Sequence, residues 1–215
     1  MPRKLTKPLK ISIVALMIAL STVFEFINHV SPLRVPWGMS VDFVAVPVLI
    51  AFFVLGTRYS ILTGVGMFVM LCFFGYANIL GAVLKFAATI PMVLVLGLFL
   101  LTPLRNKPDP IMSYKSPLRF GIAGAGALVA RCAVATAVNY LLMPIFFGLP
   151  MDQIIQVYFL GSIWGFIAFV VGLNITQGVI DLALPWILAF SFRLTERFSG
   201  AHTGTAYIPV NTIKN

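Results

Sequence analysis

Charged residues, cysteines and histidines are scarce in this sequence. Only 10% of its 215 residues are charged, whereas a typical soluble domain has about 25%. Cys72 and Cys132 both lie in apolar segments, so a disulfide framework is not expected. The two histidines, His29 and His202, form no cluster with cysteine or carboxylate residues at metal-ligand spacing. A Gly-rich phosphate-binding loop is also missing, which excludes ATP hydrolysis by that route. We predict no enzymatic activity, no metal and no cofactor.

What the sequence has in abundance is apolar residues. They make up 60% of the chain, and the mean hydropathy is +1.02, as is typical of a polytopic membrane protein. The net charge of +9 would fit a nucleic-acid-binding protein. However, the basic residues lie almost entirely between or outside the apolar runs, as they do around membrane spans. We therefore predict an all-α membrane protein embedded in the lipid bilayer, with no nucleic-acid partner.

Six apolar segments are predicted to cross the membrane, for which a helix needs about 20 residues. Basic residues cluster before the first segment, between the fourth and fifth, and after the last, and this asymmetry places both termini in the cytoplasm. Residues 1–198 should form one six-helix transmembrane domain, and residues 199–215 a cytoplasmic tail. The predicted segments are 11–30, 41–56, 58–76, 77–103, 118–146 and 168–192.

Two segments on the predicted outer side are more than simple turns. Residues 29–42 contain two prolines, a tryptophan and a glycine. Residues 148–161 contain Pro150 and Asp152, which indicate the start of a short interfacial helix. These segments either cover a pocket on the outer face or are ordinary interfacial loops.

A polar stripe runs along the last apolar segment. Asn174, Gln177, Gly178 and Asp181 are spaced i, i+3, i+4 and i+7, which places them on one face of a helix. An aspartate in a lipid-embedded helix costs about 2.5–3.5 kcal/mol on insertion scales. This face is therefore predicted to look toward a cavity, a partner side chain or a ligand.

Depth in the membrane can be counted from a rise of about 1.5 Å per residue along each helix. By this count, polar residues from several predicted segments lie together in the outer leaflet. This distribution favours an outward-facing binding pocket, because a channel needs polar lining throughout. Trp37 could stack on a planar ring of the ligand. Alternatively, the polar residues have structural roles: Lys85 reaches to the interface, and Asn139 bonds Asn174 between helices. The candidate binding residues are Glu25, Trp37, Asn78, Lys85, Asn139, Asn174 and Gln177.

Arg131 and Asp181 form a separate candidate pair. Both lie about 18 Å from the outer ends of their segments, so they should meet near the middle of the membrane. Pairing is the usual way to neutralise two buried charges. We favour a structural ion pair over a role in substrate binding or proton coupling.

A small-residue face in the first segment is formed by Ala15 and Ala19, spaced four residues apart. Such spacing lets another helix approach closely.

Short motifs also follow one another in a particular order along the chain. They are Ala15-x-x-x-Ala19 and Phe24-Glu25-Phe26, Val41-Asp42-Phe43 followed by Pro47, Gly81-x-x-x-Lys85-Phe86, Asn139-Tyr140 through Pro144, and Asn174-Ile175-Thr176-Gln177-Gly178. In their order and spacing, over about residues 11–195, they resemble those of the S component, the substrate-binding membrane subunit of energy-coupling factor (ECF) vitamin importers. The resemblance is strongest to the riboflavin-specific, RibU-like group.

This resemblance implies a multi-pass protein of a prokaryotic cell membrane that binds a vitamin near the outer face, with riboflavin as the first candidate. The first outer loop would act as a lid. Ala15 and Ala19 would dock on a transmembrane coupling subunit that carries two cytosolic ATPases. Asn139 and the Asn174–Gln177 motif would contact the ligand.

Two positions depart from the family motifs. Gln177 stands where the family has lysine, and Lys85 stands where it has asparagine. Either a lysine reaches the pocket from another wall, or the ligand is a different vitamin.

Two alternative functions remain open. Glu25, Asp42 and His29 form the one compact acid and histidine group, which an intramembrane lipid enzyme would need. A standalone proton-coupled carrier would use Arg131 and Asp181 instead.

Overall fold

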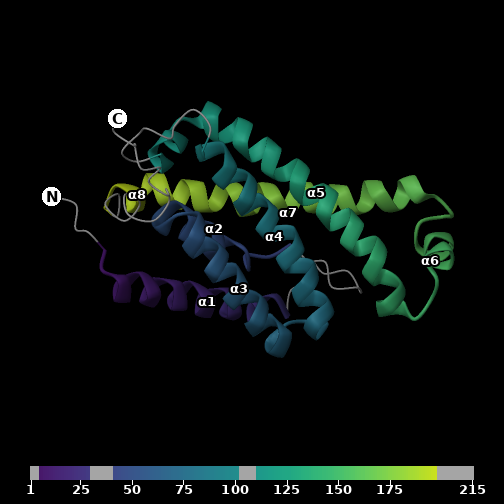
Figure 1. Ribbon diagram of the computed structural model, residues 1–215. Coiled ribbons are helices and arrows are strands. Elements are labelled where there is room, and N and C mark those ends of the chain that lie inside the picture. The colour runs from purple at the N-terminus through teal and green to yellow at the C-terminus, as the bar shows by residue number, and fades with distance from the viewer. Residues whose placement is uncertain (1–4, 30–40, 102–109, 198–215) are drawn as a thin grey trace, which may run out of the picture.

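The computed structural model of the chain describes residues 5–29, 41–101 and 110–197, which are nearly all helical and include no strand. Figure 1 shows an elongated bundle in which α5 and α7 extend past the other helices toward α6. The elements are α1 (Lys7–His29), α2 (Val46–Leu55), α3 (Thr57–Phe74), α4 (Asn78–Leu101), η1 (Ile111–Lys115, a 3-10 helix), α5 (Pro117–Phe147), α6 (Met151–Tyr158), α7 (Ile163–Ser191) and α8 (Leu194–Arg197).

Five of these helices are long and apolar enough to cross a membrane. They are α1, α3, α4, α5 and α7, with lengths from 18 to 31 residues. At about 1.5 Å per residue, even the shortest covers most of a hydrocarbon core about 30 Å thick. The prediction of an all-α, multi-pass membrane protein is confirmed.

The second predicted segment differs from the other five. Residues 41–56 were expected to span the membrane, but α2 has only 10 residues, or about 15 Å of helix. It ends at Gly56, whose φ of 92° a side chain would disfavour. Nine of its ten residues are buried, and it packs against α1, α3 and α7. A run of apolar residues has the same composition whether lipid or other helices surround it, so hydropathy did not reveal this difference.

Helix α2 brings a cluster of aromatic side chains into the centre of the bundle. Phe52 and Phe53 are fully buried and lie edge to face, with ring centroids 5.3 Å apart. Phe53 also contacts Phe120 of α5 and Phe190 of α7. These contacts hold α2 against the long helices, so the segment that precedes it is presented to the polar faces of α4 and α7.

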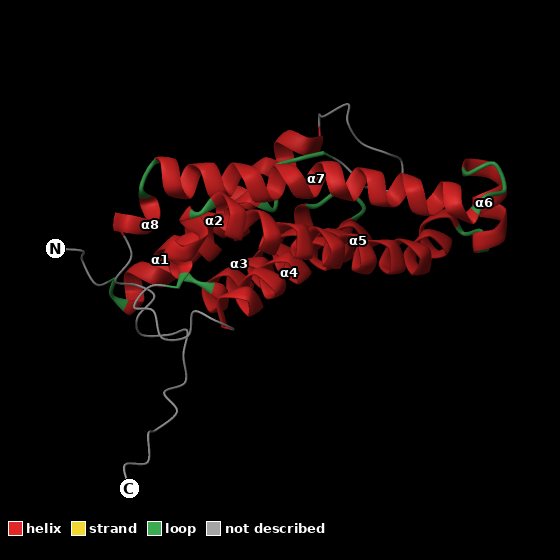
Figure 2. Cartoon of the chain, turned by 90° about the horizontal axis from the view of Figure 1, so that it is seen from above, coloured by secondary structure: helices red, strands yellow, loops and turns green. Residues whose placement is uncertain are grey.

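The short helix expected between residues 148 and 161 is α6. Pro150 is its N-cap, and Asp152 lies in its first turn. It packs on α5, and Ile154 belongs to a separate apolar cluster with Phe166 and Val170 of α7. Figure 2 shows α6 at the end of the bundle, away from α1 and α2. The predicted tail at 199–215 and most of the first outer segment lie outside the described residues.

Candidate functional site

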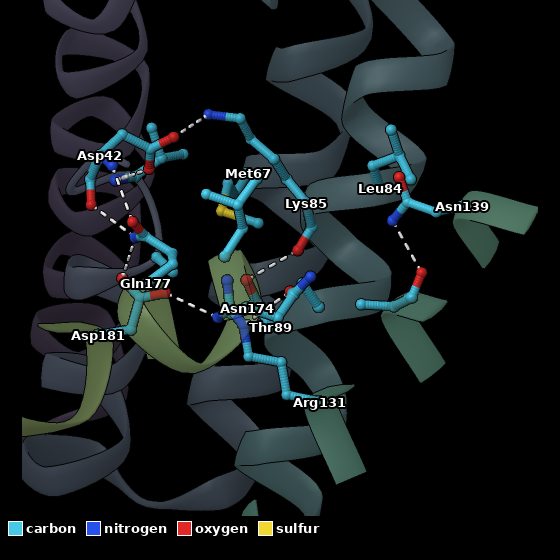
Figure 3. A pocket seen from close by; sticks show the side chains of 15 residues that line it. Asp42, Met67, Leu84, Lys85, Thr89, Arg131, Asn139, Asn174, Gln177 and Asp181 are labelled. Carbon is cyan, nitrogen blue, oxygen red and sulfur yellow. Dashed lines mark hydrogen bonds and ion pairs between the residues drawn. The ribbon is translucent and has the colours of Figure 1, made fainter. Parts of the chain in front are cut away.

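A cavity lies between α4, α5, α7 and the segment that precedes α2 (Figure 3). Its volume of about 60 Å³ is enough for about two water molecules, at roughly 30 Å³ each. The lining combines apolar side chains with charged and amide groups from several elements. The described lining residues are Asp42, Val44, Ala45, Met67, Leu84, Lys85, Ala88, Thr89, Arg131, Ala135, Asn139, Leu173, Asn174, Gln177 and Asp181.

The side chain of Gln177 forms hydrogen bonds with both backbone polar groups of Asp42. The backbone N–H of Asp42 donates to Gln177 Oε1 at 2.9 Å, and Gln177 Nε2 donates to the Asp42 carbonyl at 2.6 Å. The side chain of Asp42 accepts from the backbone N–H of Val44 at 2.9 Å. A glutamine can donate and accept at once, whereas a lysine only donates. One side chain of α7 therefore fixes the entry to α2.

Lys85 of α4 lies between two carboxylates. Its Nζ is 2.6 Å from Glu25 Oε2 and 2.5 Å from Asp42 Oδ2. Glu25 is only 1% exposed and also accepts from the backbone N–H of Tyr76 at 3.0 Å. The His29 Nε2 atom lies 3.5 Å from its other oxygen. The charge of Lys85 is thus used to join α1 and the Asp42 segment to α4.

Arg131 and Asp181 form the innermost part of the site. Arg131 Nη1 lies 2.8 Å from Asp181 Oδ2, and Arg131 Nε donates to Asn174 Oδ1 at 3.1 Å. Asp181 is fully buried, and its other oxygen accepts from Gln177 Nε2 at 2.8 Å. Gly178 leaves room for Leu128 and the arginine, because a Cβ there would lie 2.5 Å from Leu128 Cδ2 and 3.0 Å from Arg131 Cδ. Two charges on α5 and α7 are therefore paired and hydrogen-bonded inside the bundle.

These contacts join into one network that crosses the bundle. It leads from Glu25 through Lys85, Asp42 and Gln177 to Asp181, and then to the guanidinium. Buried charges are tolerated when they are paired, and removing one partner costs about 3–5 kcal/mol. The network therefore stabilises one arrangement of α1, α4, α5 and α7 around the cavity.

Asn139 of α5 has an unused acceptor at the cavity. Its Nδ2 donates to the Ala135 carbonyl at 2.8 Å, while its Oδ1 has no hydrogen-bond partner and the residue is 2% exposed. A carbonyl only accepts, so the nitrogen must face Ala135 and the oxygen must face away. An unpaired buried acceptor costs about 1–3 kcal/mol. A ligand N–H or O–H could satisfy it.

Comparison with known proteins adds one strong similarity. No protein-family model and no curated protein sequence matches the chain. The solved structure of the S component of a bacterial ECF transporter is similar to it, with a TM-score of 0.62 and 19% sequence identity. The similarity covers 89% of this chain and 98% of that one. This chain has the S-component fold. The fold predicted from the sequence motifs is therefore confirmed.

Within this S-component fold, four of the seven predicted binding residues line the cavity. They are Lys85, Asn139, Asn174 and Gln177. Glu25 is not among the lining residues, but it contacts Lys85 directly and is joined to Asp42 through Asn28. The expected bond between the two asparagines is not formed, because each donates to a carbonyl of its own helix, those of Ala135 and Val170.

Two predicted binding residues do not belong to the described cavity. Asn78 was placed in the outer half of its span, but it is the first residue of α4, is exposed and has a φ of 48°. It lies seven residues, or about 10 Å of helix, before Lys85, which explains its absence from the lining. Trp37 lies outside the described residues.

Asp42 lines the cavity but is not among the binding residues predicted from the sequence. The sequence pointed to it only as part of the Val41-Asp42-Phe43 motif and of the group with Glu25 and His29. Its signal was its place just before α2, where a carboxylate precedes a fully apolar run. In the structure both of its oxygens accept hydrogen bonds, and so do those of Glu25.

No group of three metal-ligating side chains occurs among the described residues.

The two alanines of the small-residue face are exposed on α1. Ala15 and Ala19 lie on the side of the helix that other described elements leave uncovered. The opposite side packs against α2 and α3, where Val14 is buried. A flat strip of α1 is thus available to another helix.

Proposed function

We propose that this chain is the substrate-binding subunit of an ECF importer in a prokaryotic cell membrane, with both termini in the cytoplasm. It captures a vitamin, riboflavin first among the candidates, in the cavity between α4, α5 and α7. It then delivers the vitamin together with a transmembrane coupling subunit and two cytosolic ATPases. The observation that carries the proposal is that a chain with the S-component fold gathers Lys85, Asn139, Asn174 and Gln177 around one cavity.

The cavity must enlarge to admit a vitamin. Ligand pockets usually measure about 300–1,000 Å³, several times the present volume of about 60 Å³. The segment at Asp42 forms the wall that is not part of a long helix, and it is held by Gln177 and Lys85. Movement of this segment would open the cavity without unfolding a transmembrane helix. Its contacts therefore control ligand entry and release.

Docking on the coupling subunit would use the exposed strip of α1. Ala15 and Ala19 present no side chain beyond Cβ, so a partner helix can pack closely against them. The strip lies on α1, whereas the cavity is lined by α3, α4, α5, α7 and the Asp42 segment. Docking and ligand binding should therefore be separable by mutation.

The test begins with absorbance and fluorescence spectra of the protein purified in detergent. Flavin bands that co-purify, with quenched fluorescence, would support riboflavin as the ligand. A colourless protein would be titrated with riboflavin at micromolar concentration. If it does not bind, riboflavin is the wrong ligand, and the same titration with other vitamins tests the remaining part of the proposal.

One observation favours a second candidate, a standalone proton-coupled carrier. The ion pair between Arg131 and Asp181 lies at the inner end of a network of hydrogen bonds and ion pairs. Ionisable residues inside membrane spans are rare, and in pumps and transporters they mark proton relays. Uptake that continues after ATP depletion but stops with an uncoupler would favour this candidate over the ECF subunit.

A further inference from the structure

The guanidinium of Arg131 uses only part of its hydrogen-bonding capacity on its neighbours. Nε donates to Asn174, and Nη1 donates to Asp181 and lies 3.7 Å from Met92 Sδ. Nη2 makes no hydrogen bond to any residue in the described ranges. Arg131 lines the cavity and keeps 5% of its surface exposed. Since a guanidinium carries several N–H groups, at least one is available to a molecule in the cavity.

The charge of this arginine is already neutralised. Asp181 is fully buried at 2.8 Å and is itself held by Gln177. An anionic ligand group beside Arg131 would add a second negative charge to this buried pair, which is costly at low dielectric constant. A cationic group would face N–H donors only. The free N–H groups are therefore suited to an uncharged acceptor.

The opposite end of the cavity presents a hydrogen-bond acceptor instead of donors. Arg131, Ala135 and Asn139 are spaced i, i+4 and i+8 along α5, so the first and last are about 12 Å apart along the helix axis. Asn139 Oδ1 is the unused acceptor described above. Between them the wall is formed by small or apolar side chains, including Ala88 and Leu173. A ligand in this space meets donors at one end, an acceptor at the other and an apolar middle.

We infer that Arg131 is a ligand-binding residue and that its partner Asp181 selects for ligands that are uncharged at that end. The ligand class is a ring-bearing molecule with a carbonyl or ring nitrogen facing Arg131 and an N–H or O–H donor facing Asn139. This inference rests on the proposed function, because it takes the cavity as the vitamin site. It assigns to the buried pair a role in specificity as well as in structure.

The test compares matched probes that differ by an anionic group. Binding to the purified full-length chain is measured by calorimetry for riboflavin and its phosphate ester, nicotinamide and nicotinate, and biotinamide and biotin. We expect the uncharged member to bind about tenfold or more tightly wherever a pair binds. Asp181→Asn leaves the guanidinium charge uncompensated, so this preference should shift about tenfold or more toward the anion. Asp152→Asn, an exposed carboxylate on α6, is the matched control and should bind like the wild type.

A double variant separates the specificity role from a purely structural one. Arg131→Met combined with Asp181→Leu replaces the ion pair with apolar side chains, an exchange that buried pairs often tolerate. If Arg131 contacts the ligand, affinity for the uncharged probe falls about tenfold or more, because its acceptor loses a donor.

Unchanged binding by the double variant overturns the inference, and so does a wild-type preference for the anion. Either result leaves the proposed function standing. Binding of none of the probes overturns the assignment of this cavity as a vitamin site, and the inference with it. If Asp181→Asn does not fold, the wild-type preference and the double variant still decide.

Discussion

Replacing Gln177 with leucine should release the segment that closes the cavity. The glutamine makes three hydrogen bonds, two with the backbone of Asp42 and one with Asp181, at 2.6 to 2.9 Å. Leucine is apolar and shorter by one bond, and it can make none of them. The two bonds to the backbone contribute about 0.5–1.5 kcal/mol each, and the bond to the buried carboxylate about 1.5–3 kcal/mol.

The expected loss of folding free energy for Gln177→Leu is therefore about 2.5–6 kcal/mol. In a chain of this size each kcal/mol lowers the melting temperature by about 2–4 °C, so we expect a decrease of about 5–24 °C. Gln177→Lys should lose less, because the lysine can still donate to the Asp42 carbonyl or to Asp181. Thermal unfolding in detergent measures both, and Gln153→Leu on the exposed face of α6 is the matched control.

The ligand-release rate gives a second measurement of the same contact. If Gln177 holds the closing segment, the leucine variant should release bound ligand faster than the lysine variant, and both faster than wild type. A leucine variant that melts within about 1 °C of the Gln153→Leu control would refute the reasoning. It would mean that Asp42 is held in place by its side-chain contacts alone.

Three further predictions concern α1, α5 and α7. Ala15→Trp should abolish uptake in cells that supply the partner subunits, and it should leave ligand affinity unchanged. The control Ala125→Trp, at an exposed position on α5, should leave both uptake and affinity unchanged. Normal uptake with Ala15→Trp would show that Ala15 has no docking role. Gly178→Val should lower stability by about 1–3 kcal/mol, because its Cβ would lie 2.5 Å from Leu128 Cδ2 and 3.0 Å from Arg131 Cδ. Gly172→Val, whose Cβ would have nothing within 4 Å, serves as the control in thermal unfolding. Asn139→Leu should raise the melting temperature, because it removes an unpaired buried acceptor, and lower ligand affinity about tenfold in titration; a fall in both would show that its role is structural.

Much of the fold follows from the sequence for a clear physical reason. Lipid excludes charge, so apolar runs and the basic residues between them mark the long helices with little ambiguity. The same signal could not show that α2 is a half-length helix, because burial by other helices and burial by lipid select the same residues. The segment before it is held by a tertiary contact between Asp42 and Gln177 of α7, while its end is set locally at Gly56.

The candidate site was predictable where helical periodicity decides the outcome. Asn174, Gln177 and Asp181 share a face of α7 because they are spaced by three and four residues, and the structure places all three at the cavity. Partners from other elements were harder to find. Depth along the membrane placed Asn78 in the site, but Asn78 begins α4, is exposed and does not line the cavity. Asp42 was overlooked because its partners, Lys85 and Gln177, are 43 and 135 residues away in the sequence.

The two departures from the family motifs are coupled through a single residue. Lys85 and Gln177 come from different helices, yet both contact Asp42, one at its carboxylate and the other at its backbone. A lysine at 177 could not accept from the Asp42 N–H, and it would bring a third cation near the paired guanidinium of Arg131. With Lys85 bound between two carboxylates, the described cavity keeps its unused donors at Arg131 and its unused acceptor at Asn139. The exchange of charge between α4 and α7 thus leaves the unused hydrogen-bonding groups of the described cavity on α5.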